Sequence, residues 1–112
     1  MKAPCALFLC VSLIAGCGGA GATSHLVGAQ CRTDRDCANL CTADSDFGSG
    51  MCTQPCASDR DCPGGAVCVK NAGGICAVSC AVTNDCGAFG RAFVCSTEPR
   101  PSGGDALVCR LP

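Results

Sequence analysis

The chain has 112 residues and a formal net charge of -1, and 15 of its residues are cysteine whereas only four, all phenylalanine, are aromatic. Ordering the roughly 80 residues from Cys31 onward costs on the order of 100 kcal/mol of conformational entropy, which so few large apolar side chains cannot offset unaided. This composition is typical of a disulfide scaffold and excludes a large apolar core. The balanced charge and the lack of a basic run give no reason to expect binding to nucleic acid.

The first sixteen residues have the pattern of an export signal. Lys2 precedes an apolar run from Cys5 to Ala15, and small residues follow this run. An apolar region of about 11 residues suits a cleaved signal peptide and is too short to span a bilayer as a mature helix. We therefore expect residues 1–16 to be removed and the chain to be exported.

A short motif ends this apolar run. Ile14, Ala15, Gly16 and Cys17 are a branched apolar residue, two small residues and a cysteine, and they resemble the lipobox of bacterial lipoproteins. The resemblance implies a diacylglyceryl group on the Cys17 thiol, cleavage before Cys17 and an acyl group such as palmitate on the new amine. Two or more acyl chains anchor a protein stably in a membrane. In that family an Asp after the cysteine often retains the protein at the inner membrane, so Gly18 implies the outer membrane in a Gram-negative cell. The implied partner is the membrane, through the acyl chains on Cys17.

A second cleavage site competes with the lipobox. Ala20–Ala22 is an A-x-A pattern, and cleavage after Ala22 would release a soluble secreted chain. We favour the lipobox because the A-x-A pattern lies far beyond the apolar run. Either cut removes Cys5 and Cys10 and takes Cys17 out of the thiol pool, so that 12 of the 15 cysteines remain. An even number is what a fully paired exported domain needs.

Residues 17–30 are expected to be the lipidated cysteine followed by a flexible tether. The sequence GGAGATSHLVGAQ after Cys17 is rich in glycine and alanine, and a flexible chain of this length has a typical span of roughly 20 Å. The only histidine, His25, lies in this segment. We expect it to be solvated.

The remaining twelve cysteines form three units of four. Five residues separate the first two cysteines of every unit, and three residues separate one unit from the next. Such a period indicates a modular array, with units at residues 31–55, 56–79 and 80–112. Their cysteines are Cys31, Cys37, Cys41 and Cys52 in unit 1, Cys56, Cys62, Cys68 and Cys76 in unit 2, and Cys80, Cys86, Cys95 and Cys109 in unit 3.

The third and fourth cysteines of each unit are predicted on the two strands of a hairpin. AVCVKNAGGICAV has two β-type runs around a Gly-containing turn, and unit 3 repeats them as AFVCST and ALVCR. The two prolines of the connecting EPRPSGGD should keep that stretch out of the ladder. The predicted fold is small and disulfide-rich, with three tandem four-Cys units of short β-hairpins and loops and almost no helix in the mature part. Phe47, Phe89 and Phe93 are expected to be small apolar plugs of their own units.

The disulfide pairing is open at this point. The economical arrangements join loop to hairpin, either first to third with second to fourth or first to fourth with second to third. We favour the former, although four cysteines allow three connectivities and the sequence does not choose among them.

The loops CRTDRDC, CASDRDC and CAVTNDC raise the question of a metal. Calcium needs six to eight oxygen ligands, whereas the first two loops offer only the pairs Asp34 with Asp36 and Asp59 with Asp61, and the third has Asp85 alone. Asp also forms turns by accepting backbone N–H bonds, and we favour that role. Zinc is suggested by cysteines three residues apart, but exported chains favour disulfides. We therefore predict no metal and no cofactor.

Catalysis is not predicted either. His25 lies in the expected tether, where no packed scaffold can position it as a base. Glu98, the only glutamate, lies in a proline-rich stretch with no carboxylate beside it in the sequence. No constellation of catalytic residues is therefore recognisable.

The repeats resemble those of bacterial surface lipoproteins and, distantly, the N-terminal cysteine-rich region of the Dickkopf family. The match over residues 31–112 consists of an Asp-Xaa-Asp-Cys loop and a Gly-Xaa-Cys end: Cys31, Asp34, Asp36, Cys37, Gly50 and Cys52, then Cys56, Asp59, Asp61, Cys62, Gly74 and Cys76. Unit 3 departs from the pattern because it lacks the first Asp. Dickkopf proteins are extracellular antagonists, so the resemblance implies a binding type of role.

The expected function is a non-enzymatic, lipid-anchored surface module that binds a protein or envelope component or has a structural role. The alternative is a soluble secreted effector such as a protease inhibitor. Its candidate loop is Thr97 to Asp105, because disulfides flank this loop and prolines preorganise it.

Overall fold

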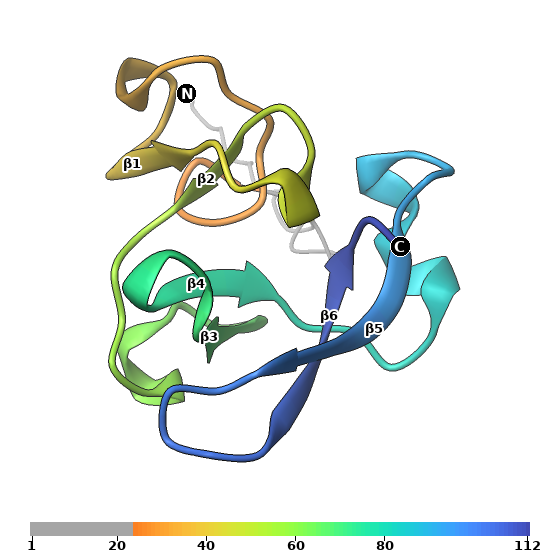
Figure 1. Ribbon diagram of the computed structural model, residues 1–112. Helices are drawn as coiled ribbons and strands as arrows, with labels where there is room; N and C mark the ends of the chain where they lie inside the picture. Colours follow the sequence, from red (N-terminus) through yellow and green to blue (C-terminus); the bar gives the residue numbers. More distant parts are fainter. Residues whose placement is uncertain (1–23) are drawn as a thin grey trace, which may run out of the picture.

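The computed structural model describes residues 24–112, which form three antiparallel hairpins with no α-helix among these residues (Figure 1). Short 3-10 helices precede or connect the strands, and none of the described helices is long and apolar enough to cross a membrane. The predicted fold class is confirmed. The strands are β1 (Leu40–Thr42), β2 (Met51–Thr53), β3 (Ala66–Val69), β4 (Ile75–Val78), β5 (Val94–Pro99) and β6 (Asp105–Arg110), and the 3-10 helices are η2 (Asp34–Asp36), η3 (Ser45–Phe47), η4 (Asp59–Asp61), η5 (Asn71–Gly73) and η6 (Thr83–Phe89).

Six disulfides hold the loops against the hairpins. The third and fourth cysteines of each unit lie directly opposite each other on paired strands, as Cys41 and Cys52 do. These two cysteines do not form a disulfide with each other, and each forms one with a cysteine of the loop that precedes the hairpin. The pairing is first to third and second to fourth in every unit: Cys31–Cys41, Cys37–Cys52, Cys56–Cys68, Cys62–Cys76, Cys80–Cys95 and Cys86–Cys109.

The segment before Cys31 is not a flexible tether over the residues that the structure describes. Ser24–Gln30, called here the N-terminal strap, packs on unit 1. The Gly28 N–H donates to the Cys52 carbonyl over 2.8 Å, the Cys52 N–H donates to the Ala29 carbonyl over 2.8 Å, and Val27 is only 4% exposed. The expectation was wrong for this part because burial of Val27 and backbone pairing with β2 offset the entropy of ordering it. The predicted signal peptide, Cys17 and residues 18–23 lie outside the described residues.

The same pairing repeats where each unit begins. The residue before the first cysteine bridges the residue before the fourth, in the pairs Gln30–Met51, Pro55–Ile75 and Ser79–Val108. Because Pro55 follows β2 and Ser79 follows β4, the chain leaves each hairpin as an added edge of the next unit's sheet. Neighbouring units are therefore joined by backbone pairing and are not independent domains.

Glycine is required where this added edge crosses the hairpin. A Cβ atom on Gly50 would lie 2.2 Å from the Cys31 carbonyl oxygen, and one on Gly74 would lie 2.3 Å from that of Cys56. Gly74 also has a φ of 118°, which L side chains rarely adopt. The Gly-Xaa-Cys motif is thus explained by close approach of the backbone, and unit 3 has Leu107 in its place.

One apolar cluster is shared by all three units. Phe47, Phe89 and Phe93 are buried, as predicted, but they belong to a single cluster that also contains Met51 and Val108. The rings of Phe89 and Phe93 have centroids 5.0 Å apart. The Phe93 ring from unit 3 also lies against the Gly48 backbone of unit 1. The aromatic side chains thus pack between units and do not act as separate plugs.

The hairpin of unit 3 is longer than the sequence suggested. Pro99 pairs with Asp105 in the ladder, so only residues 100–104 form the turn. The Arg100 N–H donates to the Gly104 carbonyl over 2.8 Å. Since hydrogen-bonded pairs alternate along an antiparallel ladder, Pro99 lies at a pair that needs no N–H, and the prolines do not exclude the stretch. This long hairpin passes beside β3 and β4 and reaches η3 of unit 1 (Figure 1).

Candidate functional site

The aspartate just before the second cysteine of each unit holds the start of its own loop. The Asp36 Oδ2 atom accepts the N–H groups of Arg32 and Thr33 over 2.8 and 3.2 Å. Asp61 and Asp85 accept the equivalent pairs over the same distances. These backbone donors hold the pKa of all three carboxyl groups below the ordinary value of 3.8.

The residue three positions before the second cysteine of each unit connects the loop to the hairpin. The Asp34 Oδ1 atom accepts the N–H of Cys41 over 2.8 Å, and Asp59 accepts that of Cys68 over 2.9 Å. In unit 3 the Thr83 hydroxyl accepts the N–H of Cys95 over 3.2 Å. A threonine thus fills the role of the missing aspartate, which makes the acid pair a structural brace of two separate contacts.

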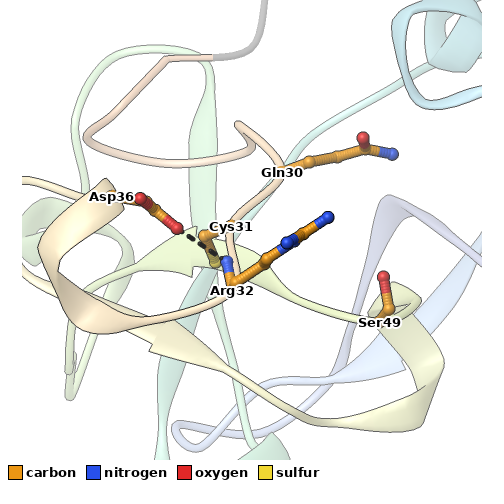
Figure 2. Close-up of a pocket in the computed structure, with 5 residues that line it drawn as sticks. All are labelled: Gln30, Cys31, Arg32, Asp36 and Ser49. Atoms are coloured by element: carbon orange, nitrogen blue, oxygen red, sulfur yellow. Dashed lines mark hydrogen bonds between the residues drawn. The ribbon is translucent and has the colours of Figure 1, made fainter.

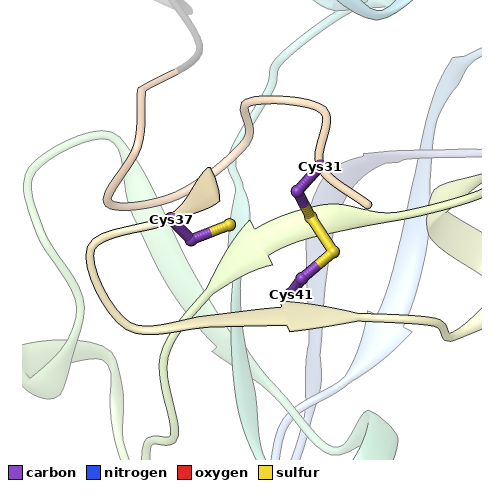
Figure 3. Close-up of side chains that lie close together, drawn as sticks. All are labelled: Cys31, Cys37 and Cys41. Atoms are coloured by element: carbon purple, nitrogen blue, oxygen red, sulfur yellow. A yellow bond between two sulfur atoms is a disulfide. The ribbon is translucent and has the colours of Figure 1, made fainter. Parts of the chain in front are cut away.

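The side chains that could bind zinc or calcium already have partners in the fold. Among residues 24–112, the groups of three or more metal-binding side chains that lie close together consist of cysteines, with sulfur atoms within 4.8 Å of one another. Figure 3 shows Cys31, Cys37 and Cys41, in which the first and third form a disulfide. Zinc binds thiolates, so these sulfur atoms would first have to be reduced. The carboxylates proposed for calcium already accept backbone N–H groups.

His25 is exposed, as expected, although it does not lie in a free tether. Its Nδ1 atom lies 2.8 Å from the Asp36 carbonyl oxygen, and its own carbonyl accepts the Ala38 N–H over 2.9 Å. It is therefore part of the N-terminal strap. The contact of its ring is with a backbone carbonyl and connects the strap to the loop of unit 1.

A cluster of charged and polar side chains joins the three units. Glu98 in β5 is only 5% exposed and accepts a hydrogen bond from Arg110 Nη1 over 2.5 Å. Arg110 Nη2 lies 3.3 Å from Asp46 Oδ1, and Asn71 donates to Asp46 and, over 3.4 Å, to Asp44. We call these five residues the polar joint. We expected Glu98 to lie in a loop, and that was wrong because Glu98 is part of β5. No carboxylate lies beside it in the sequence, but folding brings η3 of unit 1 against β6, and with it Asp46.

Burial gives Glu98 unusual electrostatics. Desolvation, followed by a hydrogen bond shared with Asp46, raises the pKa of Glu98 from 4.5 to about 7, although the charge of Arg110 opposes the shift. The Leu111 N–H also donates to the Asp46 carbonyl over 2.8 Å. The polar joint therefore fastens the end of unit 3 to unit 1 and contains a group that titrates near neutral pH.

The candidate inhibitor loop is fastened to unit 2. At the turn of this hairpin, Arg100 Nε lies 3.2 Å from Asp59 Oδ2, and Arg100 Nη1 donates to the Asp105 carbonyl over 2.6 Å. The Lys70 N–H donates to the Pro99 carbonyl over 2.8 Å. An inhibitor loop presents a free side chain to its protease, whereas the central Arg100 side chain is held by these contacts. The inhibitor alternative gains no support from this geometry.

An open hollow of about 480 Å³ lies in unit 1 and is lined by Gln30, Cys31, Arg32, Asp36 and Ser49. Figure 2 shows the side chains of Gln30, Arg32 and Ser49 extending into the same space while the Asp36 carboxylate turns toward the Arg32 backbone. The sequence analysis singled out only Asp36 and Cys31 of this set. Alignment of the three units could have found Arg32 and Ser49, because the other units have alanine or glycine at these positions.

Comparison of the chain with protein-family models, curated proteins and solved structures gives no match. The fold and contacts define the class, a small disulfide-rich module with two disulfides in each of three units. Any statement of function therefore depends on the chemistry of the residues themselves.

Proposed function

We propose that this protein is a non-enzymatic cell-surface module, anchored at the envelope of a bacterial cell through acyl chains on Cys17. The observation that carries the proposal is the pairing of all twelve cysteines from Cys31 to Cys109 in six disulfides. Such pairing is stable in oxidising compartments outside the cytosol. The lipobox and the signal sequence before it supply the route of export and the anchor.

The N-terminal strap limits how far the module would stand from the membrane. Six residues, 18–23, separate Cys17 from Ser24, the first residue of the strap. Fully extended, they span at most roughly 20 Å. We therefore propose that unit 1 faces the membrane closely, with its loops within reach of envelope components.

The processing route can be tested in cells that express the full chain. Globomycin blocks the peptidase that matures lipoproteins and leaves ordinary secretion unaffected. We expect the drug to accumulate the precursor, and we expect Cys17→Ser to abolish acyl labelling and membrane retention. The matched control is Ala22→Tyr, which destroys the A-x-A site and should change nothing. A mature chain that begins at Thr23 in treated cells would overturn the proposal and favour the soluble secreted alternative.

A further inference from the structure

The three units provide an internal test of which side chains the scaffold needs. Arg32, Ala57 and Ala81 follow the first cysteine of their units. The backbone N–H of each donates, over 2.8 Å, to the aspartate just before the second cysteine of the same unit. That contact requires no side chain, since alanine makes it in units 2 and 3. The long cationic side chain of Arg32 is therefore not explained by the fold.

The other polar residues of the hollow also differ from their equivalents. Gln30, just before the first cysteine of unit 1, corresponds to Pro55 before unit 2 and to Ser79 before unit 3, although the bridge to the second strand is the same. Ser49, three residues before the fourth cysteine, corresponds to Gly73 in unit 2 and to Ala106 in unit 3. Arg32 and Ser49 thus stand where the other units have alanine or glycine, Gln30 is longer than its equivalents Pro55 and Ser79, and all three line one hollow.

The charges in the hollow leave Arg32 available to a ligand. The Asp36 carboxylate lowers the positive potential, but its Oδ2 atom is held by two backbone N–H groups. Among residues 24–112, the ion pairs within 4.0 Å involve Arg100 and Arg110 and do not include Arg32. A guanidinium group offers a planar fork of donors that matches a carboxylate or a phosphate. Gln30 and Ser49 add side chains that both donate and accept.

We propose that the unit 1 hollow binds a sugar that carries an oxyanion, with Arg32 on the carboxylate or phosphate and Gln30 and Ser49 on the hydroxyl groups. The volume of about 480 Å³ is within the range of ligand sites and exceeds what a bare anion fills. This proposal rests on the proposed function, because a location at the cell envelope is what would bring the hollow into contact with such sugars. Because the hollow is open and has one unpaired cation, a Kd on the order of 1 mM is expected.

The test is an NMR titration of the full-length chain, exported so that its disulfides form and purified in a zwitterionic detergent. The probes are glucuronate, glucose 1-phosphate, glucose and inorganic phosphate, all at low salt. We expect saturable shifts at Gln30, Arg32 and Ser49 with at least one of the two anionic sugars, and the tighter of these identifies the oxyanion. Glucose and inorganic phosphate should each bind at least about tenfold more weakly.

Two variants make the test specific to the hollow. Arg32→Ala copies the residue of units 2 and 3, so it should fold, and it should raise the Kd at least about tenfold. Arg35→Ala removes a cation of the same loop that does not line the hollow and should change the Kd less than about twofold. Shifts that do not saturate, equal effects of the two variants, or phosphate binding as tightly as the sugars would overturn the proposal. None of these failures would affect the globomycin result.

Discussion

Units 1 and 2 have the same disulfides, the same loop contacts and the same close-approach glycine, yet they differ in the side chains that surround the loop. Arg32 and Ser49 of unit 1 correspond to Ala57 and Gly73 of unit 2, and Gln30 before unit 1 corresponds to Pro55 before unit 2. The scaffold therefore fixes few positions, and the others are free to vary with function. Unit 3 shows how narrow the fixed set is, because Thr83 replaces an aspartate and Leu107 replaces a glycine without changing the disulfide pairing.

The largest effect is expected from breaking what all three units share. Reduction of the six disulfides should unfold the chain, because each closes a loop worth roughly 3 kcal/mol in the chain-entropy model and the shared apolar cluster is small. Amide-proton dispersion and resistance to protease, measured before and after reduction, check this. Unchanged dispersion in the reduced chain would show that the apolar cluster suffices.

The close-approach glycine tests the backbone pairing between units. Gly74→Ala should destabilise by more than about 1 kcal/mol, because the new Cβ atom meets the Cys56 carbonyl at a φ of 118°. The matched control is Gly64→Ala, since a Cβ atom at Gly64 has no neighbour within 4 Å. Thermal unfolding with intact disulfides compares the two, and equal melting temperatures would rule out a steric role for Gly74.

The polar joint has no counterpart in the repeat and should give the protein a pH-dependent stability. The pKa of Glu98 is raised from 4.5 to about 7 in the folded chain. The folded state therefore holds the proton more tightly, and the stabilisation is full below pH 4.5 and is lost as the pH rises through about 7. The three loop aspartates, whose pKa values are lowered from 3.8, lose their contribution only at more acidic pH.

Glu98→Gln separates this effect from other titrations. Glutamine keeps an acceptor for Arg110 but cannot ionise, so the fall in melting temperature between about pH 5 and about pH 8 should flatten in the variant. The variant leaves Arg110 and Asp46 unaltered, so a change in the slope is assigned to the carboxyl group of Glu98. A wild-type melting temperature that rises over this interval, or an equal slope in the variant, would contradict the role of Glu98.

The smallest effect is expected from exchanging the loop braces. Asp34→Ala removes the acceptor of the Cys41 N–H and should cost about 1 kcal/mol. Asp34→Thr supplies a hydroxyl, as Thr83 does in unit 3, and should cost less than the alanine variant. Hydrogen exchange at the Cys41 amide measures both. If alanine and threonine protect that amide equally, the proposed equivalence of Asp34 and Thr83 fails.

The sequence was informative wherever a feature depends on local spacing. The spacing of the cysteines predicted the units, and the β-type runs predicted the hairpins, because both kinds of pattern depend on residues close together in the chain. The N-terminal strap and the polar joint were not predicted, since Val27 and Glu98 are fixed by contacts with distant segments. The brace by Thr83 was missed because one residue type replaced another of different charge at the same acceptor position.

We propose that this chain is an exported, lipid-anchored and fully oxidised module. The most direct measurement is the intact mass of the protein from the membrane fraction, before and after reduction and alkylation. We predict a chain that begins at Cys17 with two or three acyl groups and has twelve thiols that react only after reduction. An unacylated chain that begins at Thr23, or cysteines from Cys31 onward that are alkylated without reduction, would contradict the account.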